Sequence, residues 1–107
     1  MPPPLTNGFA SPDKLTDHFT RHHALLGVTT EAEYEARADA FLGTIPLPPD
    51  ILECVRATDG DTLRFRVSTQ EYGVLSANRF IRTYHIRNGQ GRPPRTAAWF
   101  AGRCTGS

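Results

Sequence analysis

The feature of this chain that most constrains its fold is a change in the spacing of apolar residues near Ile51. Before that point apolar side chains recur every three or four residues, which is the spacing of an amphipathic helix. After it they alternate with polar side chains, which is the pattern of a half-buried strand. Pro46, Pro48 and Pro49 separate the two regions and prevent a helix between them. The pattern therefore predicts helices in the first half of the chain and strands in the second.

Two helices are predicted, because two segments carry both start and stop signals. Ser11-Pro12-Asp13 supplies a capping hydroxyl, a proline at the first helical position and an acid in the first turn, and Gly27 ends this helix. The segment from Thr30 to Glu33 forms a capping box, and Gly43 closes the second helix. The apolar stripes are Leu15, Phe19, His22 and Leu26 on the first helix and Tyr34, Ala38, Phe41 and Leu42 on the second.

Four strands are predicted after residue 50, over residues 51–56, 62–67, 72–76 and 79–86. The turns between them are short, so successive strands are expected to be antiparallel neighbours. Residues 96–104 are predicted to form a short helix or strand that folds back on the core. The fold class is therefore α+β: two N-terminal helices packed on a four-stranded antiparallel β-sheet meander, with a short C-terminal element.

The faces of two strands matter for function. Arg64 and Arg66 alternate with apolar residues on the second strand, so they are predicted to share a solvent-exposed face. On the fourth strand, Phe80, Arg82, Tyr84 and Ile86 would share one face, and Ile81, Thr83 and His85 the other. Both of these faces carry apolar residues. The strand is therefore expected to be central or covered on both sides, and the sequence leaves open which face meets the helices.

The length of the chain predicts one domain, over residues 12–104. The proline-rich start, residues 1–11, resembles a linker to a longer chain, although a frayed terminus fits as well, and residues 105–107 form a short tail. No apolar run reaches the roughly 20 residues of a membrane span. Cys54 and Cys104 match no zinc motif. They would either form a disulfide or remain as two buried thiols.

Charge is divided unevenly along the chain. Residues 1–50 hold three basic residues and seven acids, whereas residues 51–107 hold nine arginines and four acids. Guanidinium groups match phosphate geometry and stack on bases, so the second half suggests an anionic partner such as RNA. Solvated arginines without a partner are the simpler alternative.

Two segments carry imidazole and guanidinium groups together, which metal-free RNA cleavage requires. His18 and His22 are four residues apart and share one face of the first helix. His18 lies beside the apolar stripe and is the preferred general base, because an imidazole titrates near neutral pH. His22 lies on the stripe itself and is either a second catalytic group or a core histidine. The pair also has the spacing of metal ligands, but no third ligand is evident, so no metal site is predicted.

The order of several segments resembles a known family. These segments are His18-Phe19-x-Arg21-His22, Leu26-Gly27, Glu33-Tyr34, Leu52-Glu53-Cys54-Val55-Arg56, Gly60-Asp61-x-Leu63-Arg64-Phe65, Glu71-Tyr72-Gly73-Val74-Leu75 and Ile81-Arg82-Thr83-Tyr84. Together they look like the C-terminal toxin domain of bacterial polymorphic toxins, including contact-dependent inhibition and Rhs-type proteins. Such domains are similar to the barnase–EndoU–colicin–RelE (BECR) group of ribonucleases.

The resemblance implies N-terminal helices against a twisted antiparallel sheet and a metal-independent ribonuclease without a cofactor, often one that cleaves transfer RNA. It implies delivery as part of a larger secreted toxin, action in the cytoplasm of a target cell, and a cognate immunity protein as the partner of an otherwise monomeric domain. By position, the catalytic candidates are His18, His22, Arg82, Thr83 and Tyr84. The candidates for substrate binding are Arg21, Arg64, Arg66 and His85, the last because His85-Ile86 replaces the Phe and Pro that are usual in the family.

The expected mechanism is attack by a ribose 2′-hydroxyl on the neighbouring phosphorus, with a histidine as base and Arg82 stabilising the phosphoryl oxygens. Thr83 or Tyr84 would donate a hydrogen bond to the phosphate, or Tyr84 would stack on a base. Two other functions remain open. One is a non-catalytic module that binds nucleic acid or a protein through its arginine-rich sheet. The other is a different toxin enzyme such as an ADP-ribosyltransferase, which no nucleotide-binding glycine motif supports.

Overall fold

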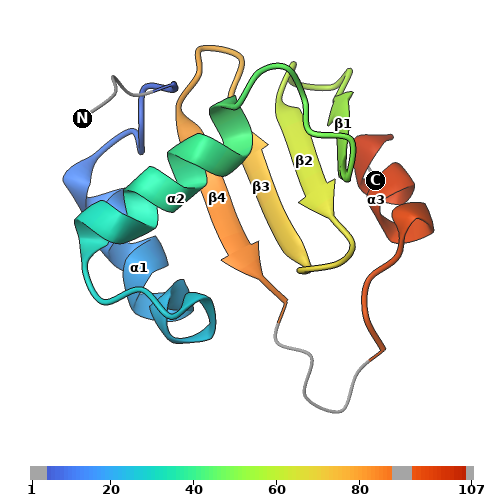
Figure 1. Ribbon diagram of the computed structural model, residues 1–107. Coiled ribbons are helices and arrows are strands. Elements are labelled where there is room, and N and C mark those ends of the chain that lie inside the picture. The colour runs from blue at the N-terminus through green and yellow to red at the C-terminus, as the bar shows by residue number, and fades with distance from the viewer. Residues whose placement is uncertain (1–4, 88–92, 106–107) are drawn as a thin grey trace.

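Figure 1 shows a four-stranded antiparallel sheet with α2 across one face and α1 and α3 at opposite ends of the molecule. The structure is a computed structural model and describes residues 5–87 and 93–105. Its elements are α1 (Pro12–Leu26), α2 (Glu31–Gly43), β1 (Ile51–Val55), β2 (Thr62–Arg66), β3 (Glu71–Leu75), β4 (Ile81–Ile86) and α3 (Ala97–Cys104). The strands pair in the order β1-β2-β3-β4, which confirms the predicted α+β meander. The C-terminal element, left open by the sequence, is a helix.

The helices begin where their capping residues predict. The Ser11 hydroxyl accepts a hydrogen bond from the Lys14 N–H of α1 at 3.2 Å. The Thr30 hydroxyl accepts one from the Glu33 N–H of α2 at 3.1 Å. Gly27 ends α1 with a φ of 70°, a left-handed conformation that costs glycine little. Local capping therefore fixes where α1 starts and stops, and with it the position of its histidines.

The sheet has an apolar core on each face. The first core lies between the sheet and the two N-terminal helices, and its largest fully buried side chains are Tyr34, Tyr84, Leu42 and Ile81. The second lies between the sheet and α3 and consists of Leu63, Phe65, Tyr72, Val74 and Phe100. Gly73 of β3 belongs to the first face, where a Cβ would lie only 2.9 Å from Leu42 Cδ2. A glycine is therefore required there for α2 to approach the sheet closely.

Arg64 does not lie on a solvent-exposed face, and that prediction is wrong. Its side chain points to the face covered by α2, and the residue is only 4% exposed. The guanidinium donates to the carbonyls of Phe41 and Thr44, at 3.1 and 2.9 Å, and pairs with Glu53 at 2.6 Å. These carbonyls belong to the C-terminal turn of α2, where helical partners are missing. Arg64 therefore joins α2 to the sheet.

A β-bulge resolves the conflict between the two faces of β4. Val74 pairs with Thr83, and Leu75, which follows it on β3, pairs with Ile81. Arg82 is therefore an extra residue on β4 without a partner on β3. The strict alternation predicted for this strand is wrong because a bulge shifts the phase of all the residues that follow it. Ile81 and Tyr84 consequently lie in the same core, and the side chain of Arg82 is 57% exposed.

The segment before α1 is part of the fold. Phe9 forms a parallel bridge with Ile81 and is 7% exposed, and the Ile81 N–H donates to the Gly8 carbonyl at 2.8 Å. Asp39 of α2 accepts a hydrogen bond from the Thr6 N–H at 2.7 Å. The predicted linker over residues 1–11 is therefore corrected for residues 5–11, and residues 1–4 lie outside the described part of the chain.

A disulfide joins Cys54 of β1 to Cys104 of α3. This settles the alternative between a disulfide and two free thiols, and it ties α3 to the edge of the sheet opposite α1. Of the predicted tail, Thr105 is described and caps the end of α3. Across residues 5–87 and 93–105, no helix is both long and apolar enough to cross a membrane.

Candidate functional site

A cavity of about 490 Å³ lies between α1 and the turn that joins β3 to β4. Its lining comprises Ala10, Lys14, Asp17, His18, Ser76, Asn78, Phe80, Ile81 and Arg82. We call it the His18–Arg82 cavity, because it contains one candidate from each of the two segments that the sequence singled out. These segments lie about 60 residues apart in sequence, and the packing of α1 beside β4 brings them together.

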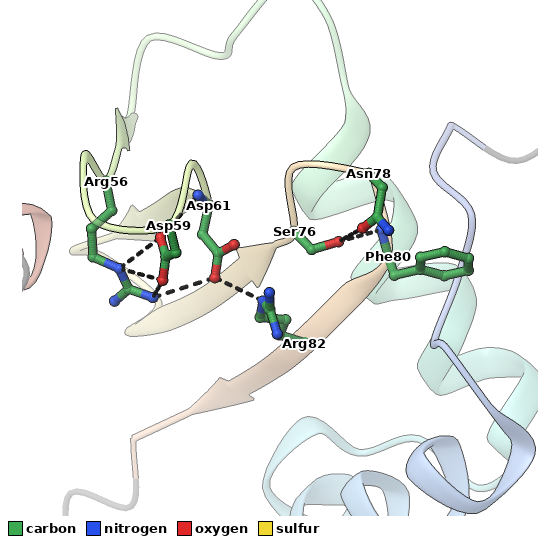
Figure 2. A network of polar contacts seen from close by, with 7 residues as sticks. All are labelled: Arg56, Asp59, Asp61, Ser76, Asn78, Phe80 and Arg82. Atoms are coloured by element: carbon green, nitrogen blue, oxygen red, sulfur yellow. Dashed lines mark hydrogen bonds and ion pairs between the residues drawn. The ribbon is translucent and has the colours of Figure 1, made fainter.

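Arg82 is held in place by a buried carboxylate. Its Nε lies 2.7 Å from Oδ2 of Asp61, which is only 1% exposed. The same oxygen accepts a hydrogen bond from Arg56 at 3.3 Å, and Arg56 in turn pairs with Asp59 at 2.8 Å (Figure 2). The two terminal nitrogens of Arg82 contact no partner within the described residues. A guanidinium fixed at Nε with its other nitrogens accessible is suited to bind a phosphate.

The bulge and the turn position this arginine. Arg79 adopts a left-handed φ of 69° within the turn. The Phe80 N–H donates to the Ser76 hydroxyl at 3.0 Å, and this hydroxyl also bonds the Asn78 side chain (Figure 2). These contacts make the β3–β4 turn a fixed wall of the cavity. The bulge residue Arg82 then projects beside that wall rather than into either core.

His18 has an unpaired nitrogen and is neutral at neutral pH. Its ring packs against Phe9, with 5.4 Å between centroids, and its Nδ1 is buried without a hydrogen-bond partner among the described residues. Burial, and then the charge of Arg21, lower the pKa of His18 below its usual 6.5. Because Nδ1 is enclosed, Nε2 is the nitrogen that a ligand in the cavity can reach. A neutral imidazole of this kind can accept a proton.

His22 and His85 extend the site away from the cavity. The rings of His18 and His22 are 5.8 Å apart, and His22 stacks on His85 at 5.0 Å. Burial and then Arg21 lower the pKa of His22 below 6.5. Burial lowers the pKa of His85 to about 4, and the charges of His22 and Arg95 act in the same direction. Both rings are therefore neutral at pH 7.

The hydrogen bonds of His85 define its tautomer. Arg95 Nη1 lies 3.4 Å from Nε2 of His85, and a guanidinium only donates, so Nε2 accepts. The proton then resides on Nδ1, which lies 3.3 Å from the Thr83 hydroxyl oxygen and donates to it. The candidates Thr83 and His85 therefore form a hydrogen-bonded pair next to Arg82, and β4 brings both toward His22.

Tyr84 lies on the opposite side of β4. Its hydroxyl donates to Glu71, and its ring is fully buried, so the expectation that it stacks on a base is corrected. Burial is also the main reason why the pKa of Tyr84 is raised. Arg66 lies on the same side of the sheet as Tyr84 and forms ion pairs with Glu71 and Asp50, each at 2.9 Å. Tyr84, Arg66 and Glu71 line a separate cavity of about 260 Å³ beneath α2.

Of the remaining candidates, Arg64 is enclosed under α2, as described above, whereas Arg21 is exposed beside the cavity. Arg21 pairs with Asp17, one turn earlier on α1, at 2.7 Å, and Asp17 itself lines the His18–Arg82 cavity. The structure thus brings His18, His22, Arg82, Thr83 and His85 into one region, with Arg21 at its margin, and places Arg64, Arg66 and Tyr84 elsewhere.

Sequence reasoning missed two residues of this site. Lys14 lines the cavity and stands four residues before His18, so helical spacing could have placed both on one face. Asp61 was named in a motif but was not among the site candidates, yet it is the carboxylate that positions Arg82. No feature of the sequence signals that this acid is buried. The lining offers the cations Lys14 and Arg82 and a neutral imidazole, and its one carboxylate, Asp17, is paired with Arg21. This combination is suited to a phosphate ester.

Within the described ranges, no group of three or more His, Cys, Asp or Glu side chains is arranged to hold a metal ion. No protein family model matches this sequence, and no curated protein matches it.

Proposed function

We propose that this domain is an endoribonuclease that cleaves RNA, with transfer RNA as the expected substrate, without a metal ion. The observation that carries the proposal is the His18–Arg82 cavity, in which a neutral imidazole and a fixed guanidinium line one pocket that is open to solvent. The order of the motifs supports the wider context: a toxin domain delivered by a larger protein, acting in the cytoplasm of a target cell and blocked by an immunity protein.

In the proposed reaction, His18 takes the proton from a ribose 2′-hydroxyl. The 2′ oxygen attacks the adjacent phosphorus, and the bond from phosphorus to the 5′ oxygen breaks. The 5′ oxygen takes a proton from water, which gives a 2′,3′-cyclic phosphate and a 5′-hydroxyl end. The protonated His18 then loses its proton to the hydroxide that remains, which restores the neutral imidazole and leaves no net change in protons.

Arg82 would stabilise the charge that develops on the phosphoryl oxygens, and Lys14 adds a second cation to the same cavity. Asp61 does not touch substrate in this scheme. It holds the Nε of Arg82 and thereby orients the terminal nitrogens toward the phosphate. Loss of a charge stabiliser of this kind typically costs about 10²–10³ in rate, and loss of a general base about 10²–10⁴.

The test is to incubate the purified domain with total transfer RNA in the presence of EDTA and to analyse the ends of the products. Cleavage with 2′,3′-cyclic phosphate ends is expected, and His18→Ala and Arg82→Ala should each lower the rate at least about 100-fold. His23→Ala is the matched control, since His23 stacks on Phe19 and does not line the cavity. Absence of cleavage, or full activity in the double variant of His18 and Arg82, would refute the proposal.

The same samples distinguish the binding-module alternative, which predicts salt-dependent RNA binding without any product. Expression in bacteria tests the toxin context. Growth should stop with the unmodified domain and continue with the His18→Ala variant.

A further inference from the structure

A row of aromatic rings connects the His18–Arg82 cavity with α3. His85 of β4 stacks on His22, and it also lies 5.6 Å from Tyr72 of β3, centroid to centroid. Tyr72 in turn contacts Trp99 of α3 at 5.2 Å. Rings from four elements, α1, β4, β3 and α3, therefore follow one another away from the cavity. The row begins at His18, whose ring lies 5.8 Å from that of His22 and which is the base of the reaction proposed above. That reaction gives Trp99 no role.

Arg95 lies over the Trp99 ring at the far end of this row. Its guanidinium carbon lies 4.1 Å from the centre of the Trp99 ring, and its Nη1 contacts His85. Its backbone is fixed by Gln70, which accepts from the Arg95 N–H at 2.6 Å and donates to the Arg95 carbonyl at 3.0 Å. A guanidinium plane that is fixed in this way is a suitable platform for a nucleic-acid base.

Positive charge predominates around this platform. Arg103 lies 5.4 Å from the Trp99 ring and is exposed. The sequence from residue 87 to residue 107 contains four arginines and no acid. Burial raises the pKa of Tyr72, the charges of Arg103, Arg56 and Arg95 each act to lower it, and the single carboxylate of Asp61 acts to raise it. This part of the surface therefore complements a polyanion.

We propose that Arg95, Trp99 and Arg103 form a second binding site for single-stranded RNA, to the side of the cleavage site. A base would stack on the Arg95 guanidinium, which Trp99 supports from below, and Arg103 would contact a phosphate. This inference rests on the proposed ribonuclease function, because it assigns the site to nucleotides that flank the scissile bond. The second site would raise the affinity for the substrate, whereas His18 and Arg82 would act in the chemical step.

The experiment uses a short single-stranded RNA in which every ribose is 2′-O-methylated, so that attack by the 2′ oxygen is impossible. Trp99 is the single tryptophan of the chain, and its fluorescence reports directly on this site. We expect the RNA to quench it, with an affinity that falls as salt rises. Unchanged Trp99 emission at saturating RNA, or a response to polyglutamate instead of RNA, would overturn the inference.

Three variants separate stacking from charge. Arg95→Lys keeps the charge and loses the plane, so binding should weaken about 5- to 100-fold, the usual effect of one stacked base. Arg103→Gln should lower the slope of log affinity against log salt by about 0.7, the value for one phosphate contact on a single strand. Arg37→Gln removes the same charge from α2, on the other face of the sheet, and should change neither quantity. If the first two variants bind as the third does, the site is absent.

Failure of this inference is distinguishable from failure of the proposed function. With cleavable RNA, Arg95→Lys should raise KM and leave kcat unchanged. If cleavage occurs but KM does not change, the second site is wrong and the ribonuclease stands. If the methylated RNA quenches Trp99 but natural RNA is never cleaved, the ribonuclease is wrong and the surface binds RNA without catalysis.

Discussion

Acidification should destabilise the fold through His85. This ring is partly buried among groups that penalise a positive charge: His22, His18 and Arg21 from α1, and Arg95 from the segment before α3. Its pKa is lowered to about 4 in the folded protein, from an ordinary value of 6.5 in the unfolded chain. Between these two values the unfolded state binds a proton that the folded state does not. Stability is therefore lost as the pH falls below 6.5, and this loss levels off below pH 4.

The magnitude follows from the two pKa values. A single group shifted from 6.5 to about 4 lowers the free energy of unfolding by about 2 kcal/mol between pH 7 and pH 5, and by about 3 kcal/mol at pH 4. The pKa values of His18 and His22 are shifted in the same direction and add to the loss. The variant His85→Gln keeps a hydrogen-bonding side chain next to Thr83 and removes the titrating group.

The assay is urea unfolding followed by Trp99 fluorescence at pH 7 and pH 5, for the unmodified protein and for His85→Gln. From pH 7 to pH 5 the free energy of unfolding should fall in both proteins, and the fall should be about 2 kcal/mol smaller in His85→Gln. This difference does not depend on the stability of the variant at pH 7. Proton NMR of the His85 ring provides an independent measurement. An equal fall in both proteins, or a ring that titrates at or above pH 6.5, would refute the reasoning.

Two further predictions concern the packing of the sheet. The Cys54–Cys104 disulfide closes a loop with a separation of 50 residues, so its reduction should lower the free energy of unfolding by about 4 kcal/mol in the chain-entropy model. Coincident urea curves with and without a reductant would contradict this. Gly73→Ala should cost about 1–3 kcal/mol, because the new Cβ meets Leu42 at 2.9 Å. In a Leu42→Val background the same change should cost less, and an equal cost would show that Leu42 is not the obstacle.

The elements of the fold were predictable because each depends on local signals. Ser11 and Thr30 cap the N-termini of α1 and α2. The short turns make each strand the antiparallel neighbour of the next. The bulge at Arg82 left only an ambiguous mark, apolar residues on both faces of the predicted strand. A regular strand covered on both sides gives the same pattern, so the sequence did not identify the bulge. The burial of Arg64 was missed for a related reason. Its partners are backbone carbonyls at the end of α2, and a sequence does not reveal which side chain will satisfy them.

The site was predictable in part. The two segments that carry His18 and Arg82 were singled out from the sequence, and they meet because α1 packs beside β4, a contact that the order of the elements allows but does not dictate. Tyr84 was placed among the same candidates because it matches a polar position of the motif Ile81-Arg82-Thr83-Tyr84. The phase of the bulged strand directs it into the opposite core, where it bonds Glu71. Adjacent positions on a strand serve different faces, so a motif read along the sequence mixes residues of the site with residues of the core.

The docked N-terminal segment has a mechanical consequence. The Phe9 ring packs on His18, and its neighbour Ala10 lines the His18–Arg82 cavity, so one wall of that cavity belongs to the first residues of the chain. A force that pulls on residue 5 would act on the hydrogen bonds to Asp39 and on the Phe9–Ile81 bridge before it reached α1. Release of these contacts would uncover His18 while the sheet remained paired. Tension on this end of the polypeptide is thus coupled directly to the integrity of the cavity.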